Sequence, residues 1–274
     1  MLFARRIREA FASIHGADWI LLALETVSVV AGILIAFALN EWASRRHDAE
    51  IHQRLMERLF EESAFDVVAL GDLADSMAEI VKKEATFEAA VESGRCPPQA
   101  DWGSVGTHGL YPAIVAPTSV YQELMNSGGL SAVDNGDVRI ALAEFHSTLD
   151  WVHQQVDYFR DARIEVIDVS DPRITIRYDP AKTETIETYD TTAICADRQF
   201  RNRLAAATRM HTVFAGYARG AHEGALATCA ALGEDLGKDC AEQFPKHIRV
   251  LSPEERKIID STVAKLRGRD ARPS

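Results

Sequence analysis

Four of the nine histidines are spaced so that a bundle of helices could bring their side chains together. His146 and His153 are seven residues apart and share one helical face, with Asp150 between them, while His211 and His222 belong to a later segment. Imidazole groups that converge inside a bundle can bind a transition metal. However, the chain has neither a Glu-x-x-His pair of the di-iron type nor a His-Glu-x-x-His motif. We therefore expect these histidines to be solvated or to lie at the edge of a core, and a metal-binding or enzymatic bundle is the alternative.

The four cysteines are an even set that permits two disulfides: Cys96 in a Gly/Pro-rich stretch, Cys195 before a helical segment, and Cys229 and Cys240 around a Gly-containing turn. Disulfides persist in oxidising compartments. Cysteine pairs with zinc-like spacing are absent from the sequence. Four unrelated buried thiols are the other interpretation, and the sequence leaves the pairing open.

Sequence motifs for catalysis and nucleotide binding are absent from the chain. There is no Gly-x-Ser-x-Gly, no phosphate-binding Gly-x-x-x-x-Gly-Lys-Ser/Thr loop, no dinucleotide fingerprint and no kinase motif. The net charge of −11 lies almost entirely after residue 42, which argues against a nucleic-acid partner because phosphate binding requires clustered Lys and Arg. We expect no catalytic residue, no cofactor and no nucleic acid.

The strongest physical signal is an apolar segment near the N-terminus. Between Trp19 and Asn40 the only charged residue is Glu25. About 20 apolar residues in a helix cross a hydrocarbon core of ~30 Å. A cleaved signal peptide has a shorter apolar core and a small-residue cleavage site, whereas this run ends at Trp42, followed by a pair of arginines. We predict a retained transmembrane helix at residues 18–42, after an amphipathic tail at residues 1–17.

Small residues recur on one face of the predicted membrane helix. Ser28, Gly32, Ala36 and Asn40 are each four residues apart, and Glu25 lies one position off that register. Small side chains let two helix backbones approach closely in lipid, and Asn40 could form a hydrogen bond at the boundary. An unpaired carboxylate inside a membrane is costly, so Glu25 is expected near the headgroups, protonated, or paired with another helix. This face predicts a homo-oligomer or contact with another membrane protein; small residues in an ordinary anchor are the alternative.

Helical periodicity continues beyond the membrane segment. Apolar residues keep a 3.6-residue period to about Ser93, which predicts one helix running from the membrane into the soluble part. Later helices are predicted at residues 118–126, 134–168, 197–232 and 252–266. Alternating Ile174, Ile176 and Tyr178 favour a small β-hairpin near 173–189. Long amphipathic helices bury their apolar stripes against each other, so we predict an all-α, antiparallel helical bundle.

The predicted soluble domain covers residues 43–267, followed by a disordered tail at 268–274. Within it, residues 94–117 are rich in Gly and Pro and are predicted to form a loop anchored by Trp102, Leu110 and Tyr111. Asp134 is predicted to cap the second long helix, and Ser252-Pro253-Glu254-Glu255 has the form of an N-cap with a proline and acidic first turn.

Two segments resemble an uncharacterised family of bacterial single-span membrane proteins. Residues Glu25 to Trp42, ETVSVVAGILIAFALNEW, are similar to the opening helix of that family, with its Val-Val-x-Gly-Ile-Leu-Ile-Ala core and Asn-x-Trp exit. Residues Tyr121 to Arg139, YQELMNSGGLSAVDNGDVR, resemble its internal Glu-Leu-x-x-Ser-Gly-x-Leu element, from which Gly136 and Val138 depart. The resemblance covers about 40 residues. It implies placement in a membrane and a helical architecture, and it implies no activity.

Together these features predict a non-enzymatic, membrane-anchored interaction, scaffold or sensing module whose partners are the lipid bilayer and a second copy or another membrane protein. Arginines lie on both sides of the membrane helix, so their distribution does not orient it. The cysteines favour a bacterial inner-membrane protein with its domain in the periplasm. A domain facing the cytoplasm, where its acidic surface docks a basic partner, is the other orientation.

Overall fold

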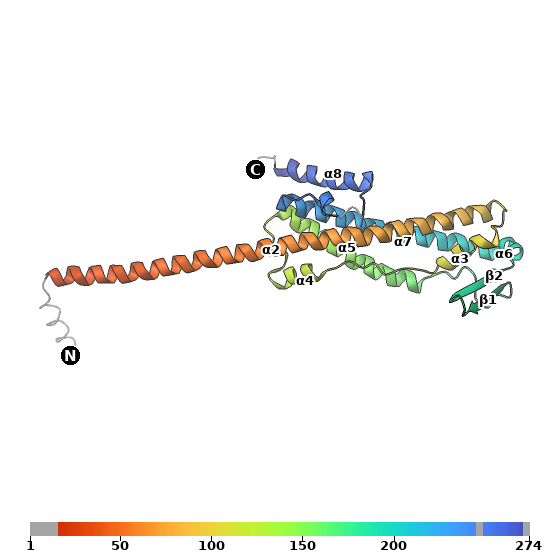
Figure 1. Ribbon diagram of the computed structural model, residues 1–274, viewed down its shortest axis with the longest axis horizontal. Helices are drawn as coiled ribbons and strands as arrows, with labels where there is room; N and C mark the ends of the chain where they lie inside the picture. The colour runs from red at the N-terminus through yellow and green to blue at the C-terminus, as the bar shows by residue number, and fades with distance from the viewer. Residues whose placement is uncertain (1–15, 245–248, 271–274) are drawn as a thin grey trace. The chain divides into compact units, whose positions relative to one another are not determined.

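The computed structural model describes residues 16–244 and 249–270, and these belong to two compact units with their boundary between Arg54 and Leu55 (Figure 1). Most of the predicted amphipathic tail (residues 1–15) and the last residues of the predicted disordered tail (271–274) lie outside the described residues. Within those limits the protein is mostly helical with one two-stranded hairpin, which confirms the predicted fold class.

Helix α2 (Gly16–Glu92) contains the predicted membrane segment and the predicted continuation in one element. It begins at Gly16 and ends just before Gly94, whose φ of +75° is unfavourable for other residues and suits a helix C-terminus. All residues from 23 to 51 are exposed. Among the described helices, α2 is the one that is long and apolar enough to cross a membrane.

The core of the second unit lies between three long helices: α2 from Leu55 onward, α5 (Gly136–Asp161) and α7 (Arg198–Leu236) (Figure 1). Apolar residues on one face of each helix are buried against the other two, which is the packing that helical periodicity predicts. Helix α7 runs antiparallel to α2 and α5 (Figure 1). Helices α2 and α5 run parallel to each other, a detail that the predicted antiparallel bundle did not include.

The parallel arrangement follows from a connection that crosses back along the bundle between α2 and α5. It contains η1 (Gln99–Asp101), α3 (Gly103–Thr107), α4 (Ser119–Asn126) and η2 (Gly129–Ala132). At its far end Glu62 on α2 accepts hydrogen bonds from the amides of Val120 (2.8 Å) and Tyr121 (3.0 Å) in the first turn of α4. These free amides carry partial positive charge, so a carboxylate stabilises the helix start there.

Three sequence expectations for this connection and α5 were wrong in detail. Trp102 and Tyr111 are buried as predicted, but Leu110 is 57% exposed and Ile114 is buried instead. The N-cap of α5 is Asn135, whose side chain accepts from two amides, and not Asp134. Helix α5 also ends at residue 161 and not near 168, because the chain turns there toward the hairpin.

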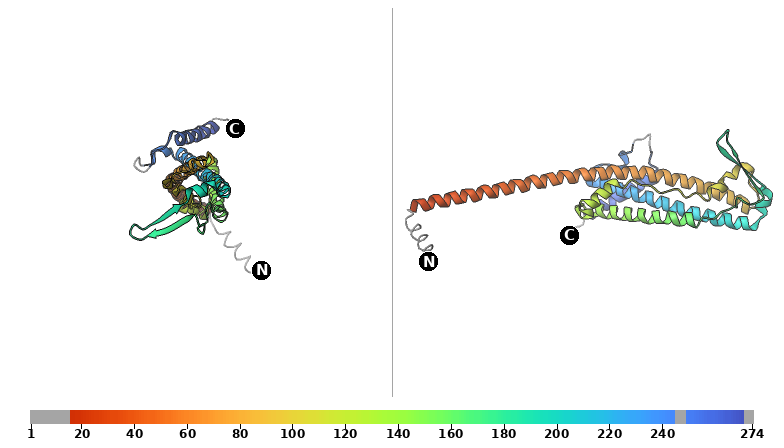
Figure 2. Two further views of the ribbon diagram at one scale, coloured as in Figure 1. Left: turned by 90° about the vertical axis from the view of Figure 1, so that its right-hand side faces the viewer. Right: turned by 90° about the horizontal axis from the view of Figure 1, so that it is seen from below.

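The predicted hairpin is present as β1 (Ile174–Asp179) and β2 (Glu184–Tyr189), paired antiparallel with Ile174 opposite Tyr189 (Figure 2). A short helix that was not predicted, α6 (Thr191–Ala196), leads from β2 to α7. Asp197 caps α7 by accepting from the amide of Gln199. These elements build a second apolar cluster around Trp102, whose ring stacks on Phe200 at 5.8 Å.

Helix α8 (Pro253–Asp270) packs on α7 and extends past the predicted end at residue 266. The predicted cap is confirmed: the Glu255 amide donates to Ser252 Oγ at 3.2 Å, and the Ser252 amide donates to Glu255 at 2.5 Å. Arg267 on α8 forms a bidentate ion pair with Glu234 on α7 at 2.8 and 2.9 Å. The 3-10 helix η3 (Cys240–Glu242) follows α7, before the chain reaches α8.

Candidate functional site

Two charged or titratable residues occupy core positions where the helical repeat calls for apolar ones. On α2 the buried residues include, at seven-residue intervals, Leu70, Met77, Glu84 and Val91. On α7 they include Leu204, His211, Ala218, Ala225 and Leu232. A seven-residue interval returns to the same helix face, so Glu84 and His211 point into the bundle. His211 was a candidate from the sequence, whereas Glu84 was missed, although the place of Glu84 in the heptad was a usable signal.

Glu84 and His211 contact each other directly. His211 Nδ1 lies 2.9 and 3.0 Å from the two carboxylate oxygens of Glu84, and both side chains are 0% exposed. Thr107 Oγ1 donates a further hydrogen bond to Glu84 at 2.8 Å. A buried carboxylate is tolerated only with such partners, so the three side chains stabilise one another.

His108 extends this polar cluster toward the surface. Its Nδ1 lies 3.6 Å from Glu84 and 2.9 Å from the carbonyl oxygen of Ser104, and its Nε2 lies 3.2 Å from the hydroxyl of Thr208. A carbonyl only accepts, so Nδ1 carries the hydrogen and Nε2 accepts from Thr208. Burial lowers the pKa of His108, and the opposing effect of nearby Glu84 is smaller. His108 is therefore held neutral in a single orientation.

Tyr111 covers the other side of His211, edge to face, with ring centroids 4.7 Å apart. Burial, and secondarily Glu84, raises the pKa of Tyr111 to about 12. Tyr111 Oη and His211 Nε2 are both buried and have no hydrogen-bond partner among the described residues. The cluster is thus closed to solvent, and its interior nitrogen is out of reach of a substrate that approaches from outside.

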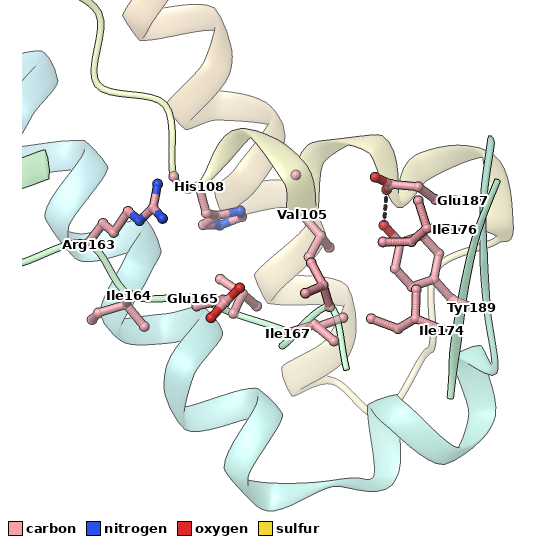
Figure 3. A pocket seen from close by; sticks show the side chains of 14 residues that line it. Val105, His108, Arg163, Ile164, Glu165, Ile167, Ile174, Ile176, Glu187 and Tyr189 are labelled. Atoms are coloured by element: carbon pink, nitrogen blue, oxygen red, sulfur yellow. Dashed lines mark hydrogen bonds between the residues drawn. The ribbon is translucent and has the colours of Figure 1, made fainter. Parts of the chain in front are cut away.

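A surface cavity of about 230 Å³ lies next to the cluster, and His108 forms part of its wall. Figure 3 shows Arg163 and Glu165 on one side of the cavity and the hairpin residues Ile174 and Tyr189 on the other. The cavity is built by three separate segments: the end of α3 with the residues after it, the stretch after α5, and the hairpin. Only the tertiary structure brings these segments together.

The four histidines proposed as an alternative metal site lie in separate environments. The His146 ring stacks on Tyr121 with centroids 3.3 Å apart, and His153 Nε2 lies 2.5 Å from the carbonyl oxygen of Ile114. His222 Nε2 lies 3.3 Å from Glu255. His146, His211 and His222 are buried, so the expected solvated or edge position was wrong for these three. Within residues 16–244 and 249–270, no group of three or more His, Cys, Asp or Glu is placed to hold a metal ion.

The predicted face of the membrane helix is uncovered in this single chain. Glu25, Ser28, Gly32, Ala36 and Asn40 are all exposed, and a Cβ added at Gly32 would meet no atom within 4 Å. The role of this face in helix packing stays a prediction.

The four cysteines form two disulfides, a pairing that the sequence left open. Cys96 and Cys195 join the loop after α2 to α6, across 99 residues of sequence. Cys229 and Cys240 join the last part of α7 to η3, across 11 residues. The turn between them depends on Gly233, because a Cβ there would lie 2.6 Å from the carbonyl oxygen of Lys238. The first disulfide fastens α6, the helix that follows the hairpin, to the loop after α2.

Comparison with known proteins finds no match for this chain among protein-family models, curated proteins or solved structures. The resemblance to the single-span family therefore stays a prediction from the two quoted segments.

Proposed function

We propose that this chain is a single-pass protein of the bacterial inner membrane whose helical domain lies in the periplasm and serves as a non-enzymatic interaction or sensing module. The observation that carries the proposal is the pair of disulfides in the domain that follows an exposed apolar helix. Structural disulfides form in oxidising compartments and are rare where glutathione and thioredoxin keep thiols reduced.

The exposed apolar surface of α2 supports membrane insertion. Large side chains such as Leu34, Phe37 and Leu39 are 60% or more exposed, and nothing in the described chain covers them. Exposing such a surface to water is energetically unfavourable, whereas burying it in the hydrocarbon core of a lipid bilayer is not. The resemblance to the single-span family points the same way.

The burial of the polar cluster around Glu84 and His211 supports a sensing or interaction role and not catalysis. Glu84 and His211 have the residue types of a catalytic pair, but they are closed off inside the bundle. Both side chains already have partners within the protein, so we interpret the pair as a structural element that holds α2 against α7.

The placement is tested by fusing alkaline phosphatase or green fluorescent protein to the C-terminus. We expect active phosphatase and a dark fluorescent fusion, because the phosphatase matures only in the oxidising periplasm and the fluorescent protein does not mature there when exported unfolded. A bright fluorescent fusion with inactive phosphatase would overturn the periplasmic placement. Titration of thiols in the purified full chain, before and after reduction, is the companion measurement, and free thiols before reduction would contradict the disulfides.

Self-association through the membrane helix is part of the proposal. Cross-linking in membranes should trap a dimer or larger oligomer, and Gly32→Leu should reduce it because a bulky side chain separates the helices. Ala38→Leu is the matched control, since residue 38 lies about 120° around the helix from Gly32 and off the face of small residues. A monomer in cross-linking, together with no effect of Gly32→Leu, would count against association by this face.

A further inference from the structure

The cavity beside His108 has a preformed wall. Val105, His108 and Val166 line it and are 7%, 1% and 4% exposed. Val105 and Val166 belong to the apolar cluster around Trp102, and His108 is fixed by its bonds to Ser104 and Thr208. A hollow that rests on buried, hydrogen-bonded residues keeps its shape when empty, which is typical of ligand sites.

The polar groups of the cavity carry opposite charges that no described residue neutralises. Arg163 and Glu165 both line it, both are exposed, and neither has an ion-pair or hydrogen-bond partner within residues 16–244 and 249–270. Glu187 differs, because its carboxylate already accepts the hydroxyl of Tyr189, as the dashed line in Figure 3 shows. The cavity thus presents one free guanidinium and one free carboxylate on the same side (Figure 3).

The remainder of the lining is aliphatic. Ile174 and Ile176 lie on the hairpin side of the space, Ile167 lies between the hairpin and Glu165, and Ile164 lies beside Arg163 (Figure 3). A volume of about 230 Å³ lies below the range of ~300–1,000 Å³ that is usual for drug-sized ligands, so the occupant is a small molecule. A hydrocarbon group of the occupant would replace water against these isoleucines, which is favourable in proportion to the area covered.

We propose that this cavity binds a small aliphatic zwitterion, that is, a free α-amino acid with a hydrocarbon side chain. Its carboxylate pairs with Arg163, its ammonium group pairs with Glu165, and its side chain lies against Ile167, Ile174 and Ile176. Arg is suited to a carboxylate because its planar fork donates two parallel hydrogen bonds. This inference rests on the proposed function in one respect: it names the ligand class of a sensing domain exposed to the periplasm.

Binding is tested by titration calorimetry and thermal unfolding of the purified full chain in detergent with four related probes. L-leucine carries both charges and the side chain, isocaproate lacks the ammonium group, isoamylamine lacks the carboxylate, and glycine lacks the side chain. We expect saturable binding and a raised unfolding temperature with leucine, and at least about tenfold weaker binding with each of the other three, since each loses a charged contact or the apolar one. Equal binding of leucine and isocaproate, or no heat with leucine at millimolar concentration, would overturn the proposal.

Two variants test which charged group of the ligand pairs with Glu165 and which with Arg163. Glu165→Gln should make leucine bind no better than isocaproate, because the ammonium group then has no partner, and Arg163→Gln should make leucine bind no better than isoamylamine. Arg177→Gln is the matched control: Arg177 lies on β1 but does not line the cavity, and its loss should leave leucine binding unchanged. Equal weakening by Arg177→Gln would mean that general surface charge, and not the cavity, attracts the ligand.

The failure of this inference is separable from failure of the proposed function. Absence of leucine binding by a chain with intact disulfides and an active phosphatase fusion removes only the ligand assignment. A reduced chain with a cytoplasmic C-terminus removes the periplasmic placement, whatever the calorimeter shows.

Discussion

His211 Nδ1 on α7 lies 2.9 Å from a carboxylate oxygen of Glu84 on α2, and neither side chain is accessible to solvent. The pair lies between two apolar clusters, one reaching Met77 and Phe214 and the other beginning at Phe87 and Ala207. A shift of either helix by one turn would leave a charge facing an apolar side chain. The pair therefore specifies the register of α2 against α7, a role that buried polar residues have in helical assemblies.

Breaking this pair should destabilise the domain more than removing it entirely. His211→Leu leaves the Glu84 carboxylate buried without its main partner and should lower the free energy of unfolding by about 3–5 kcal/mol. The double variant Glu84→Leu/His211→Leu restores an apolar heptad and should lose distinctly less. Chemical unfolding of the full chain in detergent, followed by circular dichroism, measures both. A double variant that is no more stable than His211→Leu would contradict the interpretation.

Stability should fall on acidification partly because of His146. Burial lowers the pKa of His146 from 6.5 to about 4, with smaller opposing effects of Glu62 and Asp150. Below pH 6.5 the unfolded chain binds a proton that the folded chain does not, so this contribution to stability is present at neutral pH and is lost as pH falls from 6.5 toward 4. The loss amounts to about 3 kcal/mol at the lower limit.

His146→Phe tests this directly, because phenylalanine can keep the stack on Tyr121 but cannot titrate. The unfolding temperature of the variant, measured across the same pH range, should decline less than that of the natural chain. Part of the decline should remain, since burial also lowers the pKa of His108 and His222. His47→Gln, at an exposed position of α2, should leave the pH profile unchanged, and an equally flattened profile there would refute the assignment.

Asp66 should have the opposite pH dependence. Burial, and secondarily Glu62, raises the pKa of Asp66 to about 8, and its Oδ1 has no hydrogen-bond partner among the described residues. The folded chain holds a proton that the unfolded chain releases above pH 3.8, so stability decreases as pH rises from 3.8 toward 8.

Asp66→Asn should therefore stabilise the chain by about 1–3 kcal/mol at pH 8 and have little effect at pH 4. Unfolding curves at the two pH values measure the difference. Asp48→Asn, at an exposed site on α2, is the control and should change neither curve. A gain that is equal at both pH values would show that ionisation of Asp66 is not the cause.

The two disulfides should contribute unequally to stability. A cross-link reduces the entropy of the unfolded chain more when it closes a longer loop: about 4.7 kcal/mol for the Cys96–Cys195 loop, against about 2.8 kcal/mol for the Cys229–Cys240 loop. Replacing each pair by alanine and comparing unfolding midpoints tests this order. The doubly reduced natural chain should be less stable than either variant, and the reverse order of the two variants would contradict the loop-length account.

Local signals predicted the elements that depend on local interactions. The apolar run and its helical continuation, the hairpin near 173–189 and the Ser252–Glu255 cap were each visible in a short window of sequence. The hydrogen bonds of a helix, a hairpin or a helix cap join residues that are close together in the chain. A short stretch of sequence therefore contains the residues that determine them. The cap of α5 was misplaced by one residue: Asn135 accepts from two amides of α5, and its own side-chain amide group donates to Asp235 on α7 at 2.7 Å, a contact between segments far apart in the chain.

The sequence by itself determined a membrane-sized apolar helix, an acidic helical domain and four cysteines able to pair. Only the tertiary structure decided which cysteines pair, that α2 and α5 run parallel, that Glu84 meets His211 across 127 residues of chain, and that Arg163 and Glu165 face a hairpin across one cavity. These relationships join residues far apart in sequence. They follow from how apolar stripes pack together in three dimensions, which periodicity along a single helix does not specify.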